Sequence, residues 1–158
     1  EERGSIQGKK IAWIGDGCNV CQTYMQAAEI FDFELSIATP AGYEPSEAFS
    51  QKYKKNINFF NNPMQACQEA DVVVTDVWTS MGQESEKKQR ESSFKGFQVD
   101  QLMMNQAKAD AVFMHCLPAY RGIEVSSEVI DGSQSVVWSE AENRLHAQKS
   151  LLLYLIED

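Results

Sequence analysis

Short apolar runs alternate along this chain with segments in which apolar residues recur every three or four positions. Runs of about four to six mainly apolar or β-branched residues predict buried β-strands. Six segments fit this description, at residues 10–14, 34–39, 56–60, 71–76, 111–115 and 135–138. Residues 71–76 are apolar on both faces, which is typical of a sheet that helices cover on both sides.

The segments between these runs carry helical patterns. One apolar helix face is formed by Val20, Tyr24, Ala27, Ala28 and Phe31. Ser46 is placed to cap a short helix, and Pro63 suits the first turn of another. Residues 97–107 also have a helical pattern. The last helix is expected to begin at Ser139, because Glu142, three residues later, completes a capping-box pattern.

A long polar stretch lies between residues 77 and 96, where no period survives. A loop of about 20 residues inside a compact domain is usually functional. We expect residues 79–92 to act as a lid that is mobile without ligand, because little apolar burial opposes the entropy cost of ordering them.

This alternation predicts an α/β fold: a doubly wound, mainly parallel five-stranded sheet with helices on both faces, as in Rossmann-like domains. Residues 1–158 are expected to form a single domain. Ligands of such sheets bind outside the carboxyl ends of the strands, where the winding reverses. The candidate site therefore lies at residues 15–19, 76–82 and 115–118.

Composition narrows the classes of function. Asp and Glu number 23 against 14 Lys and Arg, and the resulting net charge of -9 disfavours nucleic-acid and anionic membrane partners. No apolar run approaches the roughly 18 residues of a membrane span. The 4 cysteines are too sparse for a disulfide framework. We expect a cytoplasmic protein with reduced thiols.

The first strand end begins like a dinucleotide fingerprint, with Gly15 and Gly17, but Val20 replaces the third glycine. NAD binding is therefore disfavoured. A plain tight turn and a turn that holds an anionic group at a helix N-terminus both remain open. Cys18 and Cys21 form a CxxC pair that suits either a redox role or two unrelated thiols, and a single pair is weak evidence for zinc.

The other strand ends carry groups with clearer chemistry. Asp76 ends a buried strand, a costly position for a carboxylate unless it is paired or functional. It would suit an ammonium-bearing substrate, although it could also only satisfy turn amides. His115 and Cys116 end another strand, and adjacent strand residues face opposite sides, so no Cys-His hydrogen bond is expected. Cys116 has the better claim to the crevice.

Four motifs occur here in the same order as in ornithine carbamoyltransferase: GDGCN at 15–19, DVWTSMG at 76–82, HCLP at 115–118 and EAENR at 140–144. From about Gly8 to Ile156 the chain resembles the carboxyl-terminal, ornithine-binding domain of that family. The Ser-x-Arg-Thr motif of the family's amino-terminal, carbamoyl-phosphate-binding domain does not occur in this sequence. The resemblance implies half of a transcarbamylase, inactive alone.

In that family the side-chain amine of ornithine attacks the carbonyl carbon of carbamoyl phosphate, and citrulline and phosphate result without a metal or an organic cofactor. The resemblance implies that Asn19, Ser80 and Met81 bind the α-amino-acid end of ornithine. Asp76 would hold and orient the attacking amine. Cys18 departs from the family, which often has a second Asn at this position.

The resemblance places the carbamoyl group beside Cys116 and Leu117, whose carbonyl would accept from the carbamoyl amide. It also implies a cis Leu117-Pro118 bond. Arg144 would reach the carbamoyl phosphate oxygens, so the implied catalytic residues are Asp76, Cys116 and Arg144. An ammonium must lose a proton before it attacks, and a positioned carboxylate with a neighbouring thiolate could assist.

The resemblance also bears on assembly. Family members are homotrimers or larger assemblies built mainly through the other domain, so we do not expect this half to form that trimer. The carboxyl-terminal helix packs on that domain in the family, so part of residues 151–156 should be exposed here. Three alternatives remain: a relative that uses putrescine or an acylated ornithine, a non-catalytic binding or interaction module, and a thiol redox protein.

Overall fold

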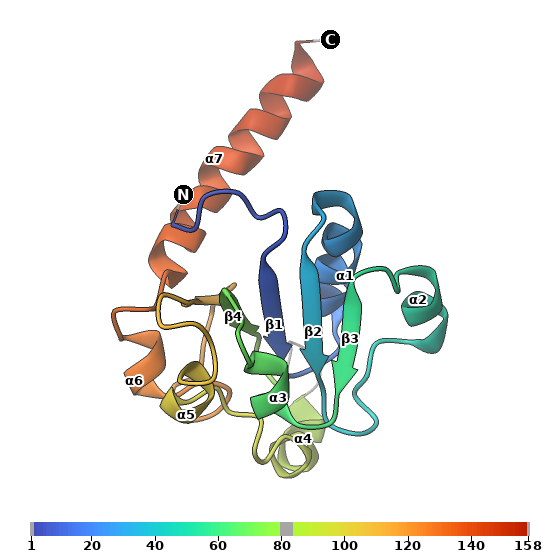
Figure 1. The fold of residues 1–158 in the computed structure, drawn as a ribbon, viewed down its shortest axis with the longest axis vertical. Coiled ribbons are helices and arrows are strands. Elements are labelled where there is room, and N and C mark those ends of the chain that lie inside the picture. The colour runs from blue at the N-terminus through green and yellow to red at the C-terminus, as the bar shows by residue number, and fades with distance from the viewer. Residues whose placement is uncertain (1, 80–83, 158) are drawn as a thin grey trace.

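The structure is a computed structural model that describes residues 2–79 and 84–157. Its sheet has five parallel strands in the order β3-β2-β1-β4-β5 (Figure 1). The strands are β1 (Lys10–Ile14), β2 (Glu34–Ala38), β3 (Ile57–Phe60), β4 (Val72–Thr75) and β5 (Val112–His115). The predicted doubly wound α/β fold is therefore confirmed.

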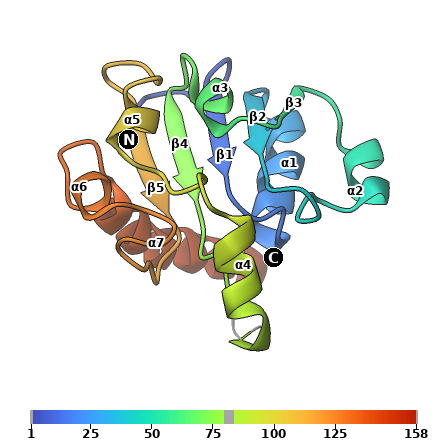
Figure 2. The same cartoon turned by 90° about the horizontal axis from the view of Figure 1, so that it is seen from below.

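Helices cover both faces of the sheet (Figure 2). One face carries α1 (Asn19–Phe31) and α7 (Val137–Ile156), and the other carries α3 (Pro63–Cys67) and α5 (Gln101–Met104). The remaining helical elements are α2 (Glu47–Lys52), the 3-10 turn η1 (Glu84–Glu86), α4 (Lys87–Ser93) and α6 (Ser127–Ile130). The helix starts expected at Ser46 and Pro63 are confirmed, with the Ser46 hydroxyl accepting from the Phe49 amide.

The strands separate two hydrophobic cores, because successive side chains of a strand point to opposite faces. Ile11 and Trp13 face the core beneath α1, whereas Ala12 and Ile14 face the core beneath α3 and α5. Helix α1 contributes Cys21, Met25 and Ala28 to the first core. The predicted helix face is thus displaced by about one residue, so that Phe31 is exposed.

Two predictions about the last segment were wrong. Residues 135–138 do not form a strand: Ser135 makes one isolated bridge to Phe113, and α7 begins at Val137. The residue before the helix is Val136, so Ser139 lies inside the first turn and does not cap it. The β-branched run predicted a strand, but its position beside β5 allows only a single bridge before the chain turns into the helix.

The polar stretch after β4 was also mispredicted in part. Residues 84–93 form η1 and α4 rather than a loop. The buried residue of α4 is Arg90, so the helix leaves no apolar period in the sequence. Conversely, the helix expected over residues 97–107 is confined to α5, which Asp100 caps through the Met103 amide.

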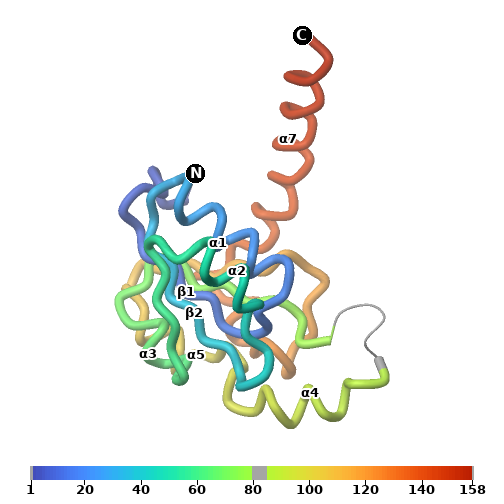
Figure 3. The backbone as a smooth tube through the Cα atoms, turned by 90° about the vertical axis from the view of Figure 1, so that its right-hand side faces the viewer, coloured from blue at the N-terminus to red at the C-terminus, as the bar shows by residue number. Residues whose placement is uncertain are grey.

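Helix α7 runs away from the rest of the domain, as Figure 3 shows. Every residue from 151 to 156 is exposed, with relative accessibilities from 48% for Leu153 to 77% for Ile156. The exposure expected from the sequence is confirmed. Among the described residues, no helix combines the length and the apolar character that a membrane crossing requires.

Asp71 lies at the edge of the sheet where the strands begin, and it holds several segments together there. It is 1% exposed and accepts hydrogen bonds from the Lys10 amide at 3.0 Å, Lys108 Nζ at 2.9 Å and Arg3 Nη2 at 3.1 Å. Burial alone would raise the pKa of Asp71, but these hydrogen bonds and the Lys108 charge lower it to about 2. The ionised carboxylate therefore ties the chain before β1 to β4.

We predict that Asp71→Asn lowers the free energy of unfolding by about 2 kcal/mol at neutral pH. Because the folded-state pKa is depressed, the contribution is complete above about pH 4 and is lost as pH falls towards 2. Urea unfolding at pH 7 and pH 2.5 measures this. Asp110→Asn, which removes an exposed partner of Arg3, is the control and should cost clearly less than Asp71→Asn, because solvent screens an exposed ion pair. Equal losses at both pH values would contradict the assignment.

Candidate functional site

The winding of the sheet reverses between β1 and β4, which are hydrogen-bonded neighbours in the sheet. The chain leaves β1 towards β2 on one side, whereas β4 leads to β5 on the other. The carboxyl ends of β1, β4 and β5 therefore meet at one edge (Figure 2). This is the position at which open α/β sheets bind ligands.

Glycines shape the turn that follows β1. Gly15 has a φ of 135°, a conformation that residues with a side chain rarely adopt. A Cβ on Gly17 would lie 2.3 Å from the Pro45 nitrogen, so no side chain fits there. The turn is thereby held close to the segment after β2 and leads directly into α1.

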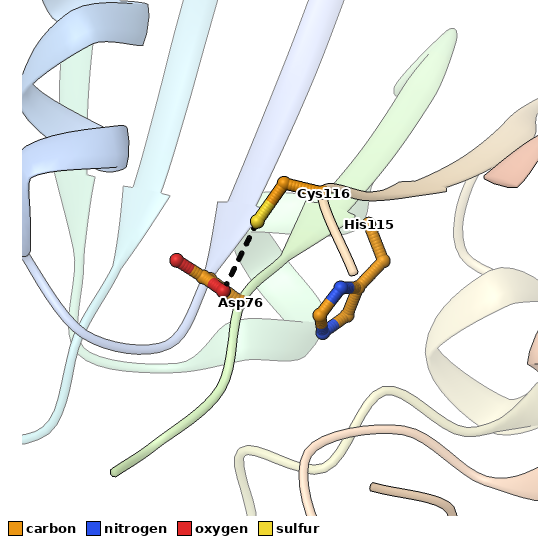
Figure 4. Close-up of side chains that lie close together, drawn as sticks. All are labelled: Asp76, His115 and Cys116. Atoms are coloured by element: carbon orange, nitrogen blue, oxygen red, sulfur yellow. Dashed lines mark hydrogen bonds between the residues drawn. The ribbon is translucent and has the colours of Figure 1, made fainter. Parts of the chain in front are cut away.

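Asp76 and Cys116 meet at the reversal point (Figure 4). Asp76 is 7% exposed, and its Oδ1 accepts from the Val77 amide at 2.7 Å and from the Cys116 thiol at 3.2 Å. Its Oδ2 lies 3.8 Å from Cys18 Sγ. One turn amide is thus satisfied, and two thiols also face this carboxylate.

Cys116 is a thiol in this arrangement rather than a thiolate. Burial raises the pKa of Cys116 to about 12, and the charge and hydrogen bond of Asp76 act in the same direction. The sulfur therefore keeps its proton at neutral pH. The S–H group donates a hydrogen bond to Asp76. The expectation of a thiolate beside the reacting amine was wrong, because a neighbouring carboxylate opposes a second negative charge.

The His115 ring extends in another direction than the Cys116 side chain (Figure 4), and its hydrogen bond is with Leu117 rather than with the thiol. It is fully buried, and its Nδ1 accepts from the Leu117 amide at 2.9 Å, so a neutral imidazole carries its proton on Nε2. Nε2 lies 3.4 Å from Oε1 of the buried Glu124. The His115 amide donates to Glu140 of α7 at 3.0 Å. These contacts position Leu117, whose peptide bond to Pro118 is cis as predicted.

Sequence reasoning missed both glutamates. Glu124 is fully buried between Ile123 and Val125, and an acid inside such an apolar pair was the signal that could have revealed it. Glu140 belongs to the EAENR motif, but only Arg144 of that motif received a role. Burial raises the pKa of Glu140, although the His115 amide and the Arg144 charge lower it in part.

The remaining predicted residues are placed less centrally. Asn19 is exposed at the first turn of α1, Leu117 is half-buried, and Arg144 is exposed one turn beyond Glu140 on α7. Ser80 and Met81 lie outside the residues that the structure describes.

The thiols of the CxxC pair are free, and burial raises the pKa of both Cys18 and Cys21. A redox-active thiol needs the opposite shift, so the redox alternative loses its physical basis. A metal ion could be considered only at Asp76, His115 and Cys116, whose ligand atoms lie within 4.8 Å of one another among the described residues. Binding would require Cys116 to lose its proton.

The fold and the strand-end chemistry define a ligand-binding α/β domain whose reversal point carries a buried carboxylate. The chain belongs to the carbamoyltransferase family: residues 7–155 match the family described as "Aspartate/ornithine carbamoyltransferase, Asp/Orn binding domain".

Ornithine carbamoyltransferases of Ruthia magnifica and Nitrosococcus oceani are 61% and 60% identical to it over 156 residues, which cover 99% of this chain and 52% and 51% of the relatives. The chain thus spans about half the length of the curated relatives it matches. The crystal structure of ornithine carbamoyltransferase from Burkholderia thailandensis aligns with a TM-score of 0.87 and 47% identity, covering 97% of this chain and 49% of that one.

We predict that Asp76→Asn accelerates alkylation of Cys116 by iodoacetamide at pH 8.5 on the order of threefold or more, because it removes the negative charge that opposes the thiolate. Peptide mass spectrometry of the protein in its folded state measures each thiol separately. Cys67 is the internal control: burial raises its pKa to about 12 without any contribution from Asp76. An unchanged Cys116 rate, or a parallel rise at Cys67, would refute the explanation.

Proposed function

We propose that this chain is the ornithine-binding domain of an ornithine carbamoyltransferase, which converts carbamoyl phosphate and L-ornithine into L-citrulline and phosphate. The observation that carries the proposal is the Asp76 carboxylate. It is nearly buried at the reversal point, and no basic side chain among residues 2–79 and 84–157 forms a salt bridge with it. A buried charge of this kind requires a cation, which the side-chain ammonium of ornithine supplies.

Asp76 accepts a hydrogen bond from the amine and orients it, and the ammonium gives to solvent the first proton, which blocks attack. The free amine then forms a C–N bond to the carbamoyl carbon, and the C–O bond to phosphate breaks as phosphate leaves. Cys116 holds the Asp76 carboxylate in one orientation through its thiol hydrogen bond. The proton of the amine passes to the carboxylate or to solvent as the new bond forms.

The carbamoyl group lies beside Cys116 and Leu117 in this proposal. The Leu117 carbonyl accepts from the carbamoyl amide, and the buried contacts of His115 hold that peptide in place. Arg144 offers a cation for the oxygens of carbamoyl phosphate, on which negative charge develops during transfer. Asp76, Cys116 and Arg144 are thus the proposed catalytic residues, while Asn19, Ser80 and Met81 bind the α-amino-acid end of ornithine.

The other half of the reaction belongs to a second domain. Residues 1–158 are proposed to form one domain, without the domain that grips carbamoyl phosphate. The exposed apolar end of α7, residues 151–156, supports this arrangement because it offers a contact surface for that domain. We propose a cytoplasmic enzyme of homotrimeric or larger assembly, in which this half alone does not form the trimer.

Two other functions remain as alternatives: one uses the same site for a different amine, and the other is not catalytic. A carbamoyltransferase for putrescine or an acylated ornithine would use the same carboxylate, but relatives named ornithine carbamoyltransferases at 61% and 60% identity favour free ornithine. A non-catalytic binding module would not need Asp76 and Cys116 to be hydrogen-bonded at the reversal point.

We predict that the 158-residue chain makes no citrulline, because positioning of both reactants supplies much of the rate and one binding site is missing. A two-domain protein that contains this chain should make citrulline from ornithine and should reject putrescine and N-acetylornithine. Colorimetric citrulline assays with each amine test this. Turnover by the isolated chain would contradict the proposal that the active site is divided between two domains.

Asp76→Asn in the two-domain protein should lower kcat/KM for ornithine by roughly 100-fold or more, since it removes the counter-charge of the attacking amine. Asp131→Asn, which removes an exposed carboxylate paired with Arg121, is the matched control and should leave kcat/KM within about twofold. If both variants behave alike, Asp76 does not have the proposed role.

A further inference from the structure

Arg90 is the buried residue of α4, at 7% exposure, and its guanidinium reaches out of that helix in several directions. Nη1 lies 2.5 Å from Oδ2 of Asp16 and 3.0 Å from the carbonyl oxygen of Trp78. Nε donates to Glu86 at 3.1 Å. Figure 1 shows α4 below the carboxyl ends of the strands.

The partners of Arg90 belong to both sides of the candidate site. Asp16 lies in the turn after β1, three residues before Asn19. Trp78 lies two residues after Asp76. One guanidinium nitrogen thus connects the turn proposed to hold the α-amino-acid end of ornithine with the segment proposed to hold its side-chain amine.

The surroundings leave these two segments little other freedom. The Asp16 carbonyl accepts from Trp13 Nε1 at 2.9 Å, and the Gly17 amide donates to the Tyr43 carbonyl at 2.8 Å. The Arg90 guanidinium lies 4.9 Å from the centre of the Tyr43 ring. The Phe94 ring contacts both Tyr43 and Trp78, at 4.8 Å and 5.3 Å between ring centres.

A buried ion pair is a poor device for stability alone, because desolvation offsets most of the attraction and apolar residues could fill the same space. Burial raises the pKa of Asp16 even though Arg90 acts against the shift. What an arginine offers at this point is geometry: a planar group with several donors fixes the directions and distances of its acceptors.

We propose that Arg90 is a positioning residue that sets substrate length, since it fixes the separation between the Asn19 turn and the Asp76 segment. The inference rests on the proposed function, in which ornithine spans these two segments. A diamino acid that is one methylene longer or shorter than ornithine then places either its amine or its α-amino-acid end out of reach. Lysine is the longer analogue and 2,4-diaminobutyrate the shorter one.

The test compares kcat/KM for L-ornithine, L-lysine and L-2,4-diaminobutyrate in the two-domain protein that contains this chain. Arg90→Met should raise the KM for ornithine about tenfold and leave the KM for carbamoyl phosphate within twofold. The preference for ornithine over the two analogues should fall about tenfold, because one methylene is discriminated by roughly this factor in a well-fixed site. Arg90→Lys keeps the charge but not the planar fork. Its preference for ornithine should lie between those of the wild-type protein and Arg90→Met.

Arg121→Met is the matched control, because it breaks an exposed Arg-Asp pair of 2.7 Å and 2.8 Å contacts and should change none of these values. If Arg90→Met does not fold, Asp16→Asn keeps the shape of the turn and should lower the same preference. A parallel loss for all three amines, or an unchanged preference in a folded variant, overturns the inference. A wild-type protein that makes no citrulline defeats the proposed function as well, whereas an active one with unchanged preference defeats only this inference.

Discussion

The pairing of β1 with β4 is the constraint on which the site depends. These strands are neighbours in space although two other strands lie between them in sequence, and the buried Thr75 hydroxyl donates to the Ile14 carbonyl at 2.6 Å where both strands end. Because the chain then departs in opposite directions, the edge beyond this contact is left uncovered by a crossover helix. Polar residues can gather there without disturbing either core.

Strand β4 has a buried carboxylate at each end, and the two carboxylates have different kinds of partner. Asp71, before the strand, is surrounded by Arg3, Lys9 and Lys108. Asp76, after the strand, accepts from a backbone amide and from the neutral thiol of Cys116. The charge of the first is balanced within the described part of the fold, and that of the second is the one proposed to meet the amine of ornithine. The same residue type therefore ties the chain together at one edge and, in the proposed function, binds substrate at the other.

The sequence was most informative where apolar residues decide the structure. Strands 10–14, 34–38 and 72–75 followed from their apolar runs, and the reversal rule led from them to Asp76 and Cys116. The sequence was least informative where the buried residues are polar. Helix α4 buries an arginine and leaves no apolar period, and the contact of Glu124 with His115 joins a loop to a strand end. Such partners become visible only once the topology brings them together.

The free end of α7 links secondary structure to assembly. Helices without tertiary contacts are marginal in water, so residues 151–156 are governed by a helix–coil equilibrium rather than by the stability of the domain core. Their amide hydrogens should exchange at rates close to those of an unstructured peptide until another surface covers them. In the proposed two-domain enzyme, completion of this helix and its contact with the second domain are one thermodynamic event, and the last two turns of α7 serve as a local indicator of it.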